Sequence, residues 1–370
     1  MLGAVARAVA RLPVVVVLAW FALAGALFVV APPLRDVAVQ DNSAFLSGDA
    51  PSVVGAEELA RIWPEDDIGN TGVLVFRKED GLAPADEDEV RAVEEWLGSD
   101  AAPENIRSTQ SPYSRPELRE ALVSPDRRVL LLVILFETAP FTPETDAAVE
   151  RIREHVRGSV PDGLAVHLTG NAGVATDQSK AINAAVERTT MITLILIVLI
   201  LLWVYRSPVT IMVPLTTVGI ALGVSQGVIA LLAERGFAVA GIVETFMVVI
   251  IFGAGTDYCL FIVSRFKEEL GLAGGEERRR VLVGTMAVIG GVIASSAATV
   301  MVGFASQGVA EFGLYRTTGP AMAIAVVITL AAGLTLTPAL LALLGRWAFW
   351  PWRPTSPQEP AADDLERAPT

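Results

Sequence analysis

The sequence predicts an α-helical integral membrane protein of six transmembrane helices, with an α+β domain between the first two. Of its 370 residues, 52% are hydrophobic and the mean hydropathy is +0.52, which is too high for an ordinary soluble protein. The apolar residues form long blocks, and about 18 or more of them in a row match a hydrocarbon core of roughly 30 Å. One long stretch, residues 34–188, is polar in composition and therefore predicts a water-exposed domain.

The first apolar block covers residues 14–31 and follows two arginines. A secretory signal would share those arginines and the small-residue ending at 29–31. The run is longer than the roughly 7–15 apolar residues of a signal, and two prolines follow it directly. We therefore expect residues 1–33 to form a short N-terminus and an uncleaved first transmembrane helix.

Residues 34–188 predict a ferredoxin-like domain. The apolar runs predict strands, and the helical spacing of apolar residues with acidic first turns predicts helices. The strands are expected at 71–76, 127–137 and 164–170, with a further one within 104–114, and the helices at 86–99 and 142–158. This order of strand, helix, strand, strand, helix, strand is the split βαβ pattern. An additional helix is expected before it, at 50–63.

The remaining apolar blocks predict five more spans within a bundle at 189–346. These are expected at about 190–204, 208–232, 239–264, 281–304 and 318–344. Most loop arginines fall on one side of the predicted bundle, and basic loops stay in the cytoplasm. We therefore expect a multi-pass protein of the cytoplasmic membrane, with both termini cytoplasmic and the domain at 34–188 extracytoplasmic. The proline-rich residues 347–370 predict a disordered cytoplasmic tail.

Several function classes are disfavoured. The net charge of −13 has the wrong sign for a nucleic-acid partner. Cys259 is the only cysteine, so it is expected to pack as a small apolar side chain. His155 and His167 lack metal-ligand spacing and are expected to serve in packing or at the surface. No catalytic triad, phosphate loop or carboxylate pair stands out, so the sequence predicts neither an enzyme nor a metal or other cofactor.

The stretch "IFGAGTDYCLFIVSRFKEEL" places Asp257 inside an apolar run, eight residues before Arg265. That separation is about 12 Å of helix, which puts the acid near the middle of the membrane. A charge there costs about 2.5–3.5 kcal/mol or more, so the carboxyl must be protonated, paired or hydrated. With the hydroxyl of Tyr258 beside it, Asp257 is a candidate proton relay. The alternative is a permanently protonated acid that is hydrogen-bonded for packing.

Small and hydroxyl-bearing residues surround this candidate relay. Gly253 and Gly255 would let a neighbouring helix approach the acid. The candidate supporting groups of the relay are Thr256, Ser295 and Ser296. For such hydroxyls, a bond to the carbonyl one turn back is the alternative role.

Two further features of the spans have expected roles. A repeated small-residue face is expected to pack helices together, and it consists of Gly219, Gly223 and Gly227. Glu244, near the predicted outer boundary, is expected to be an entrance or interface residue.

Four stretches resemble one known family. They are "DNSAFLSGDAPS", "YRSPVTIMVPL", "GAGTDYCLFIVSRFKEEL" and "GPAMAIAVVITLAAGLTLTPALLALLGRWAFWP". They are similar to the mycobacterial membrane protein large (MmpL) transporters of the resistance–nodulation–division superfamily, over almost the whole chain to about residue 352. The resemblance implies a proton-driven exporter, often of lipids, with a periplasmic porter domain. In that family, an Asp-Tyr pair on the fourth transmembrane helix meets an equivalent pair from the second half of the transporter. Asp257 and Tyr258 match the first pair, and Ser296 resembles the serine of the fifth helix that lies near it.

The family usually carries two such halves, whereas this sequence resembles one and has no second "DY" pair. Three alternatives follow: two copies associate, a separately encoded half completes the unit, or the chain is a truncated, inactive half. We expect a half-size exporter of lipids or other amphiphiles, with membrane lipids, its substrate and a homodimer or separate half as partners. The alternative function is that of a non-transporting accessory or scaffold protein.

Overall fold

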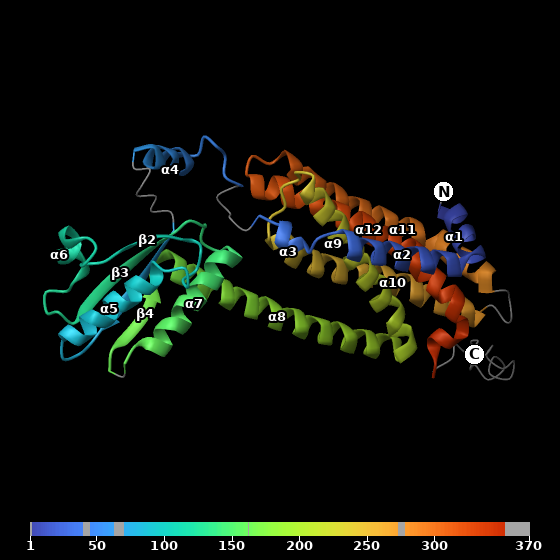
Figure 1. Ribbon diagram of the computed structural model, residues 1–370. Helices are drawn as coiled ribbons and strands as arrows, with labels where there is room; N and C mark the ends of the chain where they lie inside the picture. The colour runs from blue at the N-terminus through green and yellow to red at the C-terminus, as the bar shows by residue number, and fades with distance from the viewer. Residues whose placement is uncertain (1, 40–44, 63–69, 162, 273–277, 352–370) are drawn as a thin grey trace, which may run out of the picture. The chain divides into compact units, whose positions relative to one another are not determined.

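The computed structural model describes residues 2–39, 45–62, 70–161, 163–272 and 278–351. The chain divides into a helical unit, Met1–Val39 with Met191–Thr370, and a sheet unit, Gln40–Thr190 (Figure 1). Most of the predicted tail at 347–370 lies outside the described residues.

Six helices in the described residues are long and apolar enough to cross a membrane. They are α2 (Pro13–Val30), α8 (Gly170–Tyr205), α9 (Pro208–Glu234), α10 (Ile242–Leu272), α11 (Arg278–Ser306) and α12 (Gly313–Leu344). Each contains most or all of one predicted span, so the prediction of six spanning helices is supported. The helix α8 is much longer than its span, because it begins directly after the last strand and continues without a break.

A short helix, α1 (Leu2–Arg11), precedes the first span and was not expected as a separate element. Leu12 interrupts the helical conformation between α1 and α2, with φ −129° and ψ 53°. The reason is Pro13, because a proline disfavours helical geometry in the residue before it and is favoured in the first turn of a new helix. The result is an amphipathic helix joined to the first span at a proline.

The helix α12 is the most buried of the six and packs against α2, α9, α10 and α11. Small side chains let these neighbours come close, as at Ala321, Ala325 and Ala332, which are fully buried. Trp20 in α2 donates a hydrogen bond of 2.9 Å from Nε1 to the hydroxyl of Thr335 in α12. The helical unit is therefore organised around α12.

The sheet unit has the order of elements that the sequence predicts. These are β1 (Thr71–Arg77), α5 (Pro84–Leu97), β2 (Ile106–Gln110), β3 (Val129–Phe136), α7 (Pro143–Ser159) and β4 (Ala165–Thr169). The four strands form one antiparallel sheet in the order β2-β3-β1-β4. The helix α4 (Pro51–Ile62) precedes it, as expected. A turn of 3-10 helix, Pro116–Leu118, and α6 (Arg119–Leu122) lie between β2 and β3 and were not expected.

Alternation of side chains explains how the sheet and its helices pack. Every second residue of β1 is buried, including Leu74 and Phe76. These join buried residues of α5 and α7, such as Val90 and Ile152, in one apolar core. Burying a side chain of this size contributes about 1.5–3 kcal/mol, so this shared face holds the unit together.

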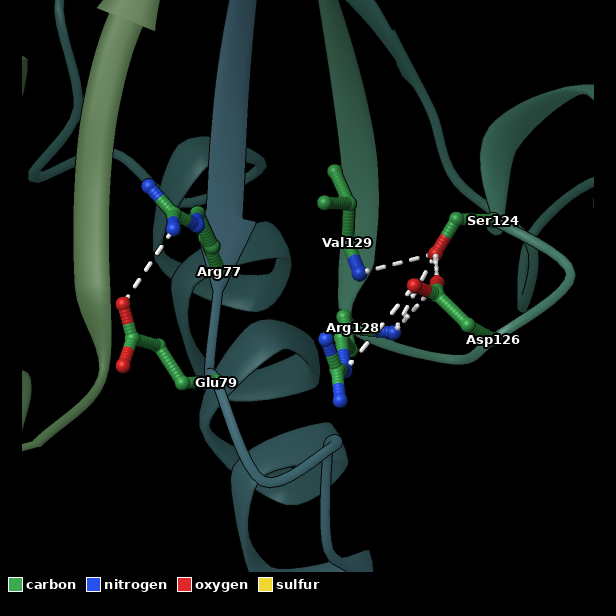
Figure 2. Close-up of polar contacts among 6 residues, drawn as sticks. All are labelled: Arg77, Glu79, Ser124, Asp126, Arg128 and Val129. Carbon is green, nitrogen blue, oxygen red and sulfur yellow. Dashed lines mark hydrogen bonds and ion pairs between the residues drawn. The ribbon is translucent and has the colours of Figure 1, made fainter.

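A tight turn sets the start of β3 (Figure 2). The Oγ of Ser124 accepts hydrogen bonds from the backbone N–H groups of Arg128 (3.1 Å) and Val129 (3.0 Å) and donates one to Asp126 (2.6 Å). These bonds hold Arg127 in the left-handed region, with φ 53°. Val129 then pairs with Arg77, which fixes the register of β3 on β1.

Candidate functional site

Asp257 lies at the middle of α10, 15 residues from each end of the helix Ile242–Leu272. At 1.5 Å per residue, it is about 22 Å from either end. Its side chain is exposed on the helical unit, and it makes no hydrogen bond or ion pair with any described residue. A carboxyl at this depth therefore stands on an uncovered face.

Tyr258 points the other way. It is 5% exposed and packs into the core of the helical unit. A Cβ atom placed on Gly333 of α12 would lie 3.5 Å from the Cβ of Tyr258, so the two helices are in close contact there. Within the described residues, the hydroxyl of Tyr258 is not hydrogen-bonded to Asp257. The predicted pair is adjacent in sequence but faces two different environments.

Asp257 belongs to an exposed stripe on α10. Its members recur every three or four residues and are Phe246, Val249, Gly253, Asp257, Phe261 and Ser264. That spacing defines a single helix face. The face is apolar except for Ser264 near one end and the acid at its centre.

The neighbouring helix α11 adds hydroxyl groups at the same level. Thr285 of α11 donates a hydrogen bond of 2.9 Å to Oε2 of Glu269 in α10, which fixes the relative height of these antiparallel helices. Asp257 is twelve residues before Glu269, and Ala297 is twelve residues after Thr285. Because both helices rise equally per residue, Asp257 lies level with Ala297 and hence with the exposed Ser296.

The predicted supporting hydroxyls differ in their bonding. Thr256 is buried and donates to the carbonyl of Phe252 at 2.6 Å, and Ser295 donates to that of Val292 at 2.9 Å. Both therefore make the bond to their own helix that was the alternative role. Ser296 is exposed and makes no hydrogen bond with a described residue.

The predicted packing glycines fall into two groups. A Cβ on Gly255 would lie 2.9 Å from Val218 of α9, and one on Gly227 would lie 2.8 Å from Leu27 of α2. The second group has no heavy atom within 4 Å of such a Cβ and comprises Gly219, Gly223 and Gly253. For these three, the expected role in helix packing stays a prediction.

A buried polar chain joins three helices next to this site. The Sγ of Cys259 lies 3.2 Å from the hydroxyl of Thr337 in α12, which lies 3.1 Å from the hydroxyl of Thr217 in α9. Cys259 is buried, as expected, but it is also hydrogen-bonded. These hydrogen-bonded side chains could not be predicted from the sequence, because each threonine stands alone in an apolar helix.

The structure also places the remaining candidates from the sequence, Glu244 and the two histidines. Gln226 donates to Oε1 of Glu244 at 3.4 Å, in the first turn of α10. The ring of His155 stacks on Trp96, with centroids 3.7 Å apart, and His167 lies exposed on the edge strand β4. Among the residues that the structure describes, no three His, Cys, Asp or Glu side chains gather as a metal site would need.

Comparison with known proteins identifies the family to which this sequence is related. A family model described as "MMPL family" matches residues 44–362. The chain belongs to the MMPL family. "Probable transport protein MmpL12" of Mycobacterium tuberculosis is 35% identical to this chain over 91% of its length. "Putative membrane protein ActII-3" of Streptomyces coelicolor is 33% identical over 95% of this chain. "Sulfolipid-1 exporter MmpL8" of M. tuberculosis is 30% identical over 92% of the chain.

This MMPL-family chain is much shorter than these relatives. The matched region makes up 29% of MmpL12, 31% of MmpL8 and 47% of ActII-3. The chain thus spans between about a third and a half of the length of the curated relatives it matches.

Proposed function

We propose that this MMPL-family chain is a six-helix unit of a proton-driven exporter of lipids or other amphiphilic small molecules across the cytoplasmic membrane. The observation that carries the proposal is the position of Asp257, exposed at mid-length on a face that is otherwise apolar except for Ser264 near one end. A carboxyl in that position changes its charge only if a proton is delivered to it or removed. Ionisable groups inside a membrane are typical of proton paths.

The proposed exporter needs a second six-helix unit on the face that contains Asp257. If this face met lipid, the carboxylate would cost several kcal/mol, and its apolar stripe would leave the acid without a partner. Covering the stripe of α10 and the exposed hydroxyl of Ser296 with a second unit would enclose the acid in a protein interior. The simplest arrangement is a second copy of this chain related by a two-fold axis, because the same face then covers itself.

The sheet unit is proposed to be an extracytoplasmic, ferredoxin-like porter domain. The loop arginines support this orientation, because they gather at one end of the bundle and basic loops stay in the cytoplasm. Protonation or deprotonation of Asp257 would then shift α12, on which Tyr258 packs. Movement of the helices would reach the sheet unit through the continuous helix α8. Lipids are the favoured substrate class, because a relative over most of this chain is named a sulfolipid exporter.

The proposal is tested by comparing surface-extractable lipids from cells that lack the chain and cells that express it. We expect at least one amphiphile to move from the cell-associated to the surface fraction when the chain is present. A protonophore should abolish this difference at unchanged ATP levels. If surface lipids are the same with and without the chain, the transport proposal is wrong and an accessory role replaces it.

A further inference from the structure

Two arginine-bearing segments meet at one end of the helical unit. The helix α1 carries Arg7 and Arg11, and α11 begins with three consecutive arginines. The Nη2 of Arg279 donates a hydrogen bond of 3.3 Å to the backbone carbonyl of Arg11, although 268 residues separate them in sequence. Figure 1 shows α1 beside that end of the bundle, and α1 packs on α11 and α12. The fold therefore gathers positive charge from two distant segments.

Both segments are held in place by packing and hydrogen bonds. The apolar side of α1 is buried, with Ala6 2% and Ala10 3% exposed. Arg278 donates to the carbonyls of Ala342 (3.3 Å) and Leu343 (3.5 Å) in the last turn of α12. A cation bonded to the last carbonyls of a helix is favourable. These bonds hold the first residue of α11 against α12, so the backbone of Arg279 and Arg280 is held in place as well.

The gathered charge is not neutralised within the described residues. Arg7, Arg11, Arg279 and Arg280 are exposed, and none makes an ion pair there. The acids near the end of α10, Glu268 and Glu269, already pair with Arg265 at 2.9 Å each. Like charges on adjacent turns repel each other, and a bound anion would remove that repulsion. The cluster has the chemistry of a phosphate-binding site.

The surface next to the cluster is apolar. The side chains where α1 passes into α2 are largely exposed, and they are Leu12 (59%), Val14 (53%), Val15 (56%) and Leu18 (61%). A free phosphate ion would make no use of them, whereas the acyl chains of a lipid would lie along them. Basic clusters at the end of a transmembrane bundle attract anionic headgroups.

We propose that Arg7, Arg11, Arg279 and Arg280 bind the phosphate headgroup of an anionic membrane phospholipid whose acyl chains lie along the exposed start of α2. The site is separate from the face that contains Asp257 and does not depend on transport. Its occupant would tie α1 to the first residues of α11, so the lipid would act as a structural ligand of the bundle.

The test is binding of fluorescent phosphatidylglycerol to the full chain in uncharged detergent. We expect saturable binding, with phosphatidylcholine at least tenfold weaker. Because each arginine near an anionic lipid contributes about 1 kcal/mol, Arg7→Gln or Arg11→Gln should weaken binding about fivefold and the double variant about thirtyfold. Arg11→Lys keeps the charge and should bind within about twofold of the wild type, so it reports on the site even if a glutamine variant folds poorly.

The matched control removes Arg235 and Arg316, which lie at the opposite end of α9 and α12. This double glutamine variant should bind phosphatidylglycerol as the wild type does. Equal losses in the control and in the Arg7/Arg11 variant would overturn the site in favour of general charge attraction. Equal binding of phosphatidylcholine, or displacement of the lipid by equimolar inorganic phosphate, would overturn the anionic-lipid assignment.

Discussion

Asp257 and Tyr258 are consecutive residues of α10, yet the carboxyl of the first is exposed and the ring of the second is 5% exposed inside the core. About 100° of helix rotation separates neighbouring residues, which accounts for the division. Asp257 therefore lies on an exposed face of the helix, whereas Tyr258 contacts α12. Tyr258, the residue next to Asp257, packs directly on α12 at Gly333.

The two glycines before Asp257 give a matched prediction. Gly255→Ala should lower the stability of the helical unit by about 1–3 kcal/mol, because the new Cβ would lie 2.9 Å from Val218 and 3.0 Å from Thr329. Gly253→Ala meets nothing within 4 Å and should be neutral or stabilising in the isolated unit. Thermal unfolding of purified monomer measures both. An equal effect of the two substitutions would contradict this packing of α10 on α9 and α12.

A second unit on the stripe of α10 predicts specific cross-linking. Gly253→Cys should form a disulfide or a short-linker cross-link between chains in native membranes, because Gly253 lies in the centre of that stripe. The background carries Cys259→Ser, which keeps a group able to bond Thr337. The control is Phe21→Cys, an exposed position on α2. Cross-links from Phe21→Cys and none from Gly253→Cys would rule out the proposed interface.

The sheet unit should lose stability in acid through Asp86. Its side chain is 6% exposed, and both carboxylate oxygens lie 2.8 Å from Nζ of Lys78. One of them also accepts a hydrogen bond from the backbone N–H of Ala83 at 2.7 Å. Burial by itself would raise the pKa of this carboxyl, but Lys78 and the Ala83 N–H together hold the pKa below its usual value of 3.8.

Protonation of Asp86 sets the direction in which stability changes with pH. Because the pKa of Asp86 is lower in the folded than in the unfolded protein, its contribution is present above about pH 3.8 and is lost as the pH falls through the folded-state value. Asp86→Asn should cost about 1–3 kcal/mol at pH 7 and remove that part of the acid sensitivity. Pulsed hydrogen exchange in β1, after incubation at each pH, measures it. Asp88→Asn, in an exposed pair with Arg91, is the control and should change stability by less than about 1 kcal/mol.

Local patterns were enough to predict most of the fold. Six hydropathy blocks became six long helices because length and composition alone decide whether a helix can cross a membrane. The strands of the sheet unit followed from their short apolar runs, as in β1. The helix α1 was not predicted, because the residues before the first apolar block were assigned only to a short N-terminus.

The site was only partly predictable. Counting residues along one helix predicts a mid-membrane depth for Asp257, and the structure places it at the middle of α10. That Asp257 stands on an open face depends on which helices pack beside α10, which no single-helix pattern contains. The same is true of the contact between Thr217 and Thr337, which lie 120 residues apart.

The substitution Asp257→Asn distinguishes a proton carrier from a hydrogen-bonding group. Asparagine has nearly the shape of the protonated acid but binds and releases no proton in this range. Because it removes the cost of a charge at mid-membrane depth, stability should hold or rise slightly. If Asp257 carries protons, export should nevertheless fall at least a hundredfold at wild-type expression. Tyr258→Phe, which removes a hydroxyl and keeps the packing on Gly333, should reduce export less.

The measurement is export of the surface lipid identified for the wild type, with expression and melting temperature matched. Glu268→Gln is the control, because it makes the same acid-to-amide change at an exposed site near the end of the same helix. It should retain most of the activity, since its carboxylate pairs with Arg265 and is far from mid-membrane depth. Full export by Asp257→Asn would mean that the acid serves only as a hydrogen-bonding group, and the proton relay would have to be abandoned.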